Sequence, residues 1–229
     1  MNIIELNHVD FRWQKADDLT LAIDSLAIKR GHKVLLNGDS GSGKSTLLSL
    51  LTGINKPEQG SIKILGVEIT ALSNAKMDNF RADHIGYIFQ QFNLIPYLSV
   101  VENVLLSCRF SKKRGSNSLK ENVTQAHALL SQLDIGSHLF DRNITQLSIG
   151  QQQRVAAARA LIGAPEIIIA DEPCSALDPV NSQRFIELLM RECEQQQSTL
   201  ILVSHDESLS SWFDYQLPLS QINLASQLT

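Results

Sequence analysis

Hydrophobic and polar positions alternate in several short stretches, the pattern of half-buried β-strands. Residues 3–9 and 21–28 show this alternation, and further short strands are predicted at 33–37, 61–65 and 67–69. The last two flank Gly66 and predict a hairpin. Three further apolar runs predict strands at 85–89, 166–170 and 199–203.

Helical periodicity and capping signals separate these strands. The run 44–51 predicts a helix that ends before Gly53, and Asp178 followed by Pro179 predicts the start of a helix that reaches about residue 195. Ser99 and Glu102 have capping-box spacing, and 119–133 has helical periodicity. Strands alternating with helices indicate an α/β fold.

The domain organisation follows from where the helical character is concentrated. We expect a single domain over 1–229, in which 1–92 and 160–229 form a sheet-containing core and 93–159 an inserted helical part. The basic segment 111–120 is expected to be a solvated surface loop.

Composition excludes several classes of protein. The chain of 229 residues carries 20 Lys and Arg against 24 Asp and Glu, a net charge of −4, which argues against binding nucleic acid by neutralising phosphates. Hydrophobic residues make up 43%, so a filled core is expected rather than disorder. The three cysteines show no CxxC spacing, and the start shows no secretory signal, which together favour a reducing cytosol. No apolar run is long enough to cross a bilayer.

One glycine-rich turn has a specific chemical meaning. Residues 38–45 read G-D-S-G-S-G-K-S and match the Walker A pattern G-x-x-x-x-G-K-[ST], between a predicted strand and a predicted helix. Glycines allow backbone N–H groups to converge on phosphate oxygens, and Lys44 adds positive charge. The Ser45 hydroxyl is a candidate Mg²⁺ ligand. Asp39 is unusual in an anion-binding loop, and we expect its backbone rather than its carboxylate to face the phosphate.

Polar residues also follow three other predicted strands. Asp171 and Glu172 end an apolar strand, Gln90 follows another, and His205 lies two residues after a third. Because open α/β sheets bind ligands at the carboxyl ends of their strands, these residues are expected to build one site with the Walker A loop. In that site Asp171 would hold Mg²⁺, and Glu172 would polarise the attacking water.

The order of these motifs resembles one family. Residues 147–151, Leu-Ser-Ile-Gly-Gln, are similar to the LSGGQ signature of ATP-binding-cassette (ABC) ATPases, with Ile149 in place of the first glycine. Gln90 matches the family's Q-loop, residues 175–178 its D-loop, and His205 its switch histidine. The resemblance covers essentially the whole chain. It implies a P-loop NTPase with a RecA-like core, an N-terminal antiparallel β-subdomain and an inserted α-helical subdomain.

The resemblance also implies roles for individual residues. In the family, two chains form a head-to-tail dimer that encloses two ATP molecules, and the signature of one chain completes the site of the other. The residues implied to bind ATP are Trp13 (at the adenine, with Phe11 as the alternative), Gly38, Ser40, Gly41, Ser42, Gly43, Lys44, Ser45 and Thr46. Those implied to act in trans are Ser148, Gly150 and Gln151, with Asp178 coupling the sites. Glu172 and His205 are the implied catalytic residues, and Ser45, Gln90 and Asp171 the implied Mg²⁺ ligands. Cys174 stands where the family usually has threonine.

The segment 89–104 and the run 147–159 are similar to the macrolide-exporter, lipoprotein-release and cell-division ATPases. This group implies an ATPase subunit at the cytoplasmic face of the inner membrane, driving a separate permease. The candidate permease-docking residues are Phe92, Leu94, Pro96 and Tyr97, although packing within the chain explains any one of them equally well. The alternatives are an ABC ATPase of a non-transport complex, such as one acting in cell division or on DNA or ribosomes, and a P-loop kinase or GTPase. The signature motif has no role in the last of these.

Overall fold

The chain forms two compact units. The computed structural model describes residues 1–14, 18–115 and 117–225. The first unit comprises Met1–Arg81 and Ile201–Thr229, and the second comprises Ala82–Leu200. The expected division at residues 92 and 160 remains a prediction about the subdomains.

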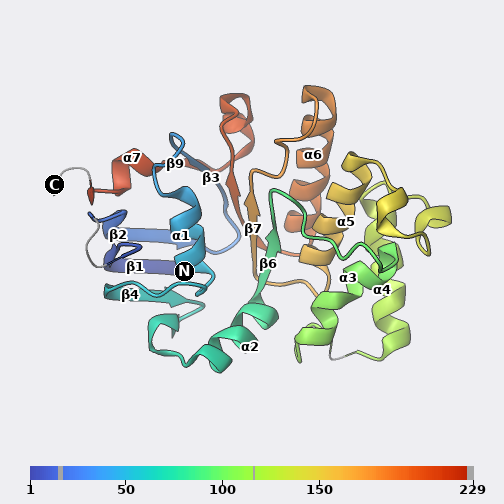
Figure 1. Cartoon of the computed structure of the whole chain (residues 1–229), viewed down its shortest axis with the longest axis horizontal. Helices are drawn as coiled ribbons and strands as arrows, with labels where there is room; N and C mark the ends of the chain where they lie inside the picture. The colour runs from blue at the N-terminus through green and yellow to red at the C-terminus, as the bar shows by residue number, and fades with distance from the viewer. Residues whose placement is uncertain (15–17, 116, 226–229) are drawn as a thin grey trace. The chain divides into compact units, whose positions relative to one another are not determined.

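An antiparallel sheet makes up much of the first unit (Figure 1). Its strand order is β2-β1-β4-β5, and its strands are β1 (Asn2–Phe11), β2 (Leu21–Lys29), β4 (Gln59–Ile64) and β5 (Val67–Glu68). Ile64 pairs with Val67 across the turn at Gly66, so the predicted hairpin is confirmed. Ile4 and Leu6 of β1 are buried at alternate positions, and after a register shift between Asn7 and Asp10 so are Val9 and Phe11, as a sheet with one covered face requires.

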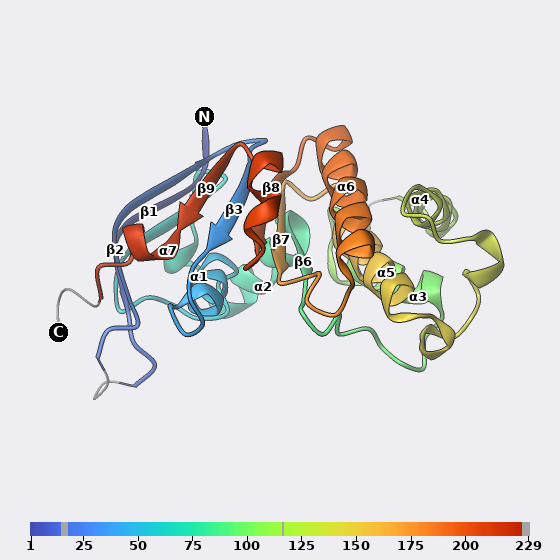
Figure 2. The same cartoon turned by 90° about the horizontal axis from the view of Figure 1, so that it is seen from above.

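A parallel pair of strands carries the glycine-rich turn. Strand β3 (Lys33–Asn37) pairs in parallel with β9 (Tyr215–Pro218), with Asn37 opposite Pro218. Helix α1 (Lys44–Leu51) follows β3, and the short α7 (Leu219–Ile222) follows β9 (Figure 2). The turn after β3 and the segment after β9 therefore start at the same edge. The sequence patterns did not predict β9 or α7, because a four-residue strand ending in proline carries little periodicity.

The second unit contains parallel strands and most of the helices. Strand β6 (Ile85–Ile88) pairs with β7 (Ile167–Asp171), and Ile88 lies opposite Ala170, so the residues that follow both strands share one edge. The helices are α3 (Val100–Phe110), α4 (Leu119–Gln132), α5 (Ile149–Leu161) and α6 (Pro179–Gln195). Helix α5 packs against α3, α4, α6 and β6, with buried alanines at 156–158 that permit close approach. These strands and helices confirm the expected α/β class.

The chain passes from one unit to the other within two elements, α2 (Asn74–His84) and β8 (Thr199–Val203). Helix α2 was not predicted, because Met77 is its only buried side chain among those described and its apolar periodicity is weak. Short 3₁₀ turns complete the fold at Ile69–Ala71, Ser137–Leu139, Ile144–Gln146 and Glu207–Trp212.

The capping signals read from the sequence are confirmed. Ser99 and Glu102 form a complete capping box at α3, and Ser148 and Gln151 form another at α5. Asp178 caps α6, where its side chain accepts a hydrogen bond from the N–H of Asn181.

The basic segment 111–120 differs from the prediction of a solvated loop. Arg114 is only 4% exposed, and its guanidinium donates hydrogen bonds to the carbonyls of Ile162 (2.7 Å) and Ala160 (2.7 Å) at the end of α5. Burial lowers the pKa of Arg114 to about 10, which still leaves it charged at neutral pH. The prediction of a solvated loop was therefore wrong for this residue, because a helix that ends inside the protein needs donors for its last carbonyls.

Among the described residues, no helix combines the length and apolar character needed to span a membrane.

Candidate functional site

The glycine-rich turn lies between β3 and α1, as its sequence predicts. Lys44 begins α1 and is 7% exposed. Its ammonium donates to the backbone carbonyls of Gly38 (2.7 Å) and Asp39 (2.8 Å), so the chain folds around this cation. The positive group is thereby held against the backbone of the turn at a helix N-terminus, a position that favours the binding of a phosphate. Ser45 is exposed on the first turn of α1, and Thr46 is buried.

Gly43 shows why this turn requires glycine. Its φ of 104° lies in the left-handed region, and an added Cβ would come within 2.8 Å of Leu21 Cδ2. The neighbouring Ser42 has a buried Oγ with no hydrogen-bond partner among the described residues. The loop therefore packs closely on the start of β2.

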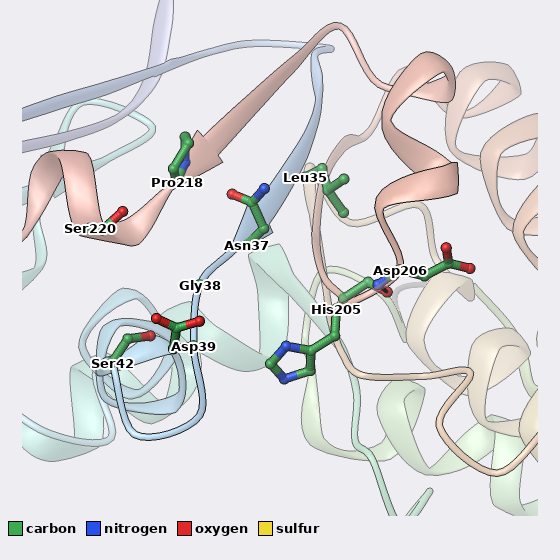
Figure 3. A pocket seen from close by; sticks show the side chains of 10 residues that line it. Leu35, Asn37, Gly38, Asp39, Ser42, His205, Asp206, Pro218 and Ser220 are labelled. Carbon is green, nitrogen blue, oxygen red and sulfur yellow. Dashed lines mark hydrogen bonds between the residues drawn. The ribbon is translucent and has the colours of Figure 1, made fainter.

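An open cavity of about 330 Å³ adjoins this turn within the first unit (Figure 3). Asp39 reaches it from the loop after β3, and His205 reaches it from the loop after β8. The structure thus brings His205 to the phosphate-binding turn, as predicted. The exposed Asp39 side chain also lines the cavity, and which of its groups would face a phosphate remains a prediction.

The two aromatic candidates near residue 12 differ in exposure. Phe11 is 6% exposed and belongs to the core, whereas Trp13 is 60% exposed. Their rings meet edge to face with centroids 5.2 Å apart. Only Trp13 presents a large aromatic surface to a ligand.

The second unit carries the carboxylates. The side-chain amide of Gln90 donates to Glu172 Oε2 at 3.1 Å, and the hydroxyl of Tyr87 donates to Asp171 Oδ2 at 3.3 Å. Burial and the nearby Asp171 carboxylate raise the pKa of Tyr87 well above its usual value, so Tyr87 remains a donor. The edge shared by β6 and β7 thus brings Gln90, Asp171 and Glu172 together, as predicted.

Glu172 has an unusual backbone conformation. Its φ is 43°, although it is not a glycine and precedes Pro173. Such strain is found where surrounding contacts hold the chain, often at functional sites. One contact comes from the buried Gln153 of α5, whose Nε2 donates to the Pro173 carbonyl at 2.6 Å and lies 3.8 Å from Cys174 Sγ.

The signature segment forms the N-terminus of α5. Ser148 Oγ accepts from the N–H of Gln151 at 3.3 Å, and Gln151 Oε1 accepts from the N–H of Ser148 at 3.0 Å. The N–H groups of Ile149 and Gly150 have no acceptor within the helix and face outward from its first turn. Ile149 is 54% exposed, so its side chain is accommodated without burial.

Asp178 carries the D-loop prediction. It accepts hydrogen bonds from the backbone of Asn181 (3.1 Å) and from its side chain (2.6 Å), and these bonds lower the pKa of Asp178. Its carboxylate is therefore ionised at the start of α6.

The residues expected to face a partner divide into two groups. Phe92 is buried, which favours the alternative of packing within the chain for this residue, whereas Tyr97 is 79% exposed. Pro96 is exposed and Leu94 is partly buried. Arg159 of α5 donates to the carbonyl of Phe92 at 2.5 Å, which holds this turn of the chain.

Sequence reasoning missed several residues that position the site. They are Tyr87, Gln153, Arg159 and Asn223. Each acts through a backbone carbonyl or a carboxylate that is distant in sequence, so no local spacing signals it. The run of three glutamines at 151–153 is the one visible clue.

Comparisons with known proteins agree with this geometry. Residues 21–175 match the ABC transporter family. The uncharacterised ABC transporter ATP-binding protein MJ0796 of Methanocaldococcus jannaschii is 38% identical over 89% of this chain and 87% of its own length. The lipoprotein-releasing system ATP-binding protein LolD of Cytophaga hutchinsonii is 40% identical over 86% of this chain and 87% of its own length.

One relative is much longer than this chain. The macrolide export ATP-binding/permease protein MacB of Syntrophobacter fumaroxidans is 38% identical over 92% of this chain, which spans only 29% of MacB. Among solved structures, a dimeric post-hydrolysis state of MJ0796 bound to ADP and Pi has a TM-score of 0.83 and 35% identity. It covers 94% of this chain and 93% of that one.

Proposed function

The chain belongs to the ABC transporter family as an ATP-binding subunit and ATPase, and on that premise we propose that it drives a separate membrane permease. MacB carries ATP-binding and permease parts under one name, whereas this chain matches only part of MacB's length. None of the relatives named above supports a role on DNA or ribosomes, or a kinase or GTPase activity.

In the proposed site, the turn 38–46 binds the phosphates of ATP. The observation that carries this proposal is the position of Lys44 at the start of α1, where its ammonium is held by the carbonyls of Gly38 and Asp39. The assigned residues are Gly38, Ser40, Gly41, Ser42, Gly43, Lys44, Ser45 and Thr46. The exposure of Trp13, against the burial of Phe11, favours Trp13 as the residue that stacks on adenine.

The available oxygen donors suit Mg²⁺. Ser45 offers a hydroxyl, Asp171 a carboxylate and Gln90 an amide oxygen, and hard oxygen ligands are those that Mg²⁺ prefers. No cluster of three or more His, Cys, Asp or Glu among the described residues could hold a metal by itself. Mg²⁺ is usually bound by one or two carboxylates together with substrate phosphates, so phosphate oxygens of ATP would complete its ligands. When bound, it would neutralise charge on the phosphates.

Hydrolysis is assigned to Glu172 and His205. Glu172 is the general base for the attacking water, and the hydrogen bond from Gln90 fixes the direction of its carboxylate. His205, in the cavity beside the phosphate-binding turn, would hold the γ-phosphate and the attacking water. Because catalysis depends on the position of the reacting groups, the Gln90–Glu172 hydrogen bond and the contact of His205 with the attacking water should both affect the turnover rate.

Two chains are proposed to form a head-to-tail dimer around ATP, and solved relatives are dimeric. In this assembly Ser148, Gly150 and Gln151 act on the nucleotide bound by the partner. Because the capping box uses the N–H and the side-chain oxygen of Gln151, the N–H of Gly150, which has no acceptor within the helix, is the group suited to meet a phosphate. Asp178, ionised at the start of α6, is placed to couple the two sites.

The permease is proposed to dock at the cytoplasmic face of the membrane. Tyr97 and Pro96 are the exposed members of the expected surface, and Leu94 is partly exposed. Exposed aromatic and apolar side chains are typical anchors of protein interfaces.

The test is phosphate release by the purified chain with ATP and Mg²⁺, compared with its Lys44→Ala variant. We expect turnover by the wild type and loss of ATP binding in Lys44→Ala. Equal ATP affinity in the two proteins would overturn the assignment of the turn.

A further inference from the structure

A single asparagine connects the C-terminal segment to the phosphate-binding turn. Asn223 Oδ1 accepts from the N–H groups of Ala22 (2.9 Å) and Ala225 (3.1 Å). Its Nδ2 donates to the carbonyls of Thr20 (3.0 Å) and Ser42 (3.3 Å). An amide side chain has two donor hydrogens and two acceptor lone pairs, so all four positions are used.

The contact with Ser42 bears on the direction of an N–H group. The Ser42 carbonyl and the Gly43 N–H belong to one trans peptide, and in such a planar unit they point in opposite directions. A donor that holds the carbonyl therefore also holds the N–H. Gly43 is the N-cap of α1, where N–H groups have no intrahelical acceptor and are available to a phosphate.

The segment around Asn223 also supports the rest of the turn. Leu219 is fully buried, and its Cβ lies 3.3 Å from where a Cβ on Gly38 would be. The N–H of Leu224 donates to the Ala22 carbonyl at 2.8 Å. The segment 219–225 thus contacts the beginning of the turn, its last peptide and the start of β2.

We propose that Asn223 is a positioning residue for nucleotide binding, which fixes the Ser42–Gly43 peptide of the phosphate-binding turn against β2. The inference rests on the proposed function, because it assigns an effect on the nucleotide that this turn binds. It makes the segment 219–225 part of the binding machinery, although this segment carries none of the recognised motifs. Asn223 acts through the backbone and not by touching the reacting atoms.

The test compares Asn223→Ala with Asn55→Ala. Asn55 is also partly buried in the first unit, and its hydrogen bonds within the described part of the chain go to Ser49, whose Oγ lies 3.0 Å from its Nδ2, and not to the turn. Loss of a hydrogen bond that orients a ligand-binding N–H should raise the KM and the Kd for ATP about tenfold in Asn223→Ala, with kcat within about twofold of the wild type. In Asn55→Ala we expect a similar fall in melting temperature with both ATP constants unchanged.

A second variant separates the two halves of the contact. Asn223→Asp keeps an acceptor for Ala22 and Ala225 but places an oxygen opposite the carbonyls of Thr20 and Ser42. Its ATP affinity should fall at least as far as that of Asn223→Ala. Amide hydrogen exchange, measured without nucleotide, supplies a readout that needs no catalysis. In both Asn223 variants the exchange of the peptide covering 38–46 should be faster than in the wild type.

The outcomes are distinct. If Asn223→Asp, or Asn223→Ala, binds ATP like the wild type and protects 38–46 equally, the inference is wrong while the proposed function stands. If the wild-type chain fails to bind ATP, the proposed function fails and the inference fails with it. A raised KM in Asn223→Ala but not in Asn55→Ala supports the inference.

Discussion

The side-chain amide of Gln90 donates a hydrogen bond to the carboxylate of Glu172, with Nε2 and Oε2 3.1 Å apart. The two residues are 82 positions apart in the chain, yet Glu172 directly follows β7 and Gln90 lies two residues after its parallel neighbour β6. A residue proposed to contact Mg²⁺ is thereby joined to the proposed general base. The bond explains how one conformation of Glu172 can be maintained at the end of a sheet.

Glu172→Gln tests the base directly. The glutamine oxygen can still accept from Gln90, so the substitution removes the negative charge with little change in geometry. We expect ATP to bind with near-normal affinity and the rate of phosphate release to fall about 10²- to 10⁴-fold. Size-exclusion chromatography with ATP should show an accumulated dimer. Glu187→Gln, at an exposed position of α6, is the matched control, and turnover of Glu172→Gln near its level would exclude Glu172 as the base.

Gln153→Leu tests the link between α5 and the loop that carries the base. Leucine has a similar size but cannot donate to the Pro173 carbonyl, so the strained conformation of Glu172 loses one of its supports. We expect kcat to fall about tenfold with little change in ATP affinity, equivalent to the loss of one hydrogen bond.

Gln125→Leu is the control for this change, because Gln125 on α4 also has a buried Oε1 without a partner among the described residues. Equal losses of activity and melting temperature in both variants would show that Gln153 contributes only to stability.

Tyr97→Asp tests the proposed docking surface. Tyr97 is 79% exposed, so a charged residue there should leave folding and ATP binding intact while disrupting an apolar contact with the permease. We expect the variant to lose co-purification with its membrane partner. Phe110→Asp changes an equally exposed aromatic at the end of α3 and should retain the partner. Full assembly of Tyr97→Asp would place the docking surface elsewhere.

Arg114→Met tests whether the buried arginine stabilises the end of α5. Methionine fills similar space but leaves the carbonyls of Ile162 and Ala160 without their donor. We expect the free energy of unfolding to fall by about 3 kcal/mol, since buried acceptors would be left unsatisfied.

Arg12→Met is the comparison for Arg114→Met, because Arg12 forms a partly exposed ion pair with Glu58 and should contribute less than about 1 kcal/mol. Urea unfolding measures both variants. A loss in Arg114→Met no larger than in Arg12→Met would contradict the assigned role.

Local signals were sufficient for many features of this protein. The Walker A turn, the capping boxes at Ser99 and Ser148, and the N-cap at Asp178 were read correctly. In each of these, the residues that interact lie within a few positions of one another, so their spacing is visible in the sequence. The grouping of Gln90 with Asp171 and Glu172 was also predictable, because parallel strands end at a common edge.

Other features depended on contacts between distant segments, and only the tertiary structure decided them. In the folded chain Phe92 is buried and Tyr97 is exposed. Arg114, expected in a solvated loop, is buried and donates to a carbonyl at the end of α5. The pairing of β3 with β9 brought Asn223 to the phosphate-binding turn, 181 positions from Ser42. The sequence by itself thus determined the chemistry and the family, because these reside in short motifs. The structure decided which side chains support that chemistry, because such support is provided by backbone groups that no spacing along the chain reveals.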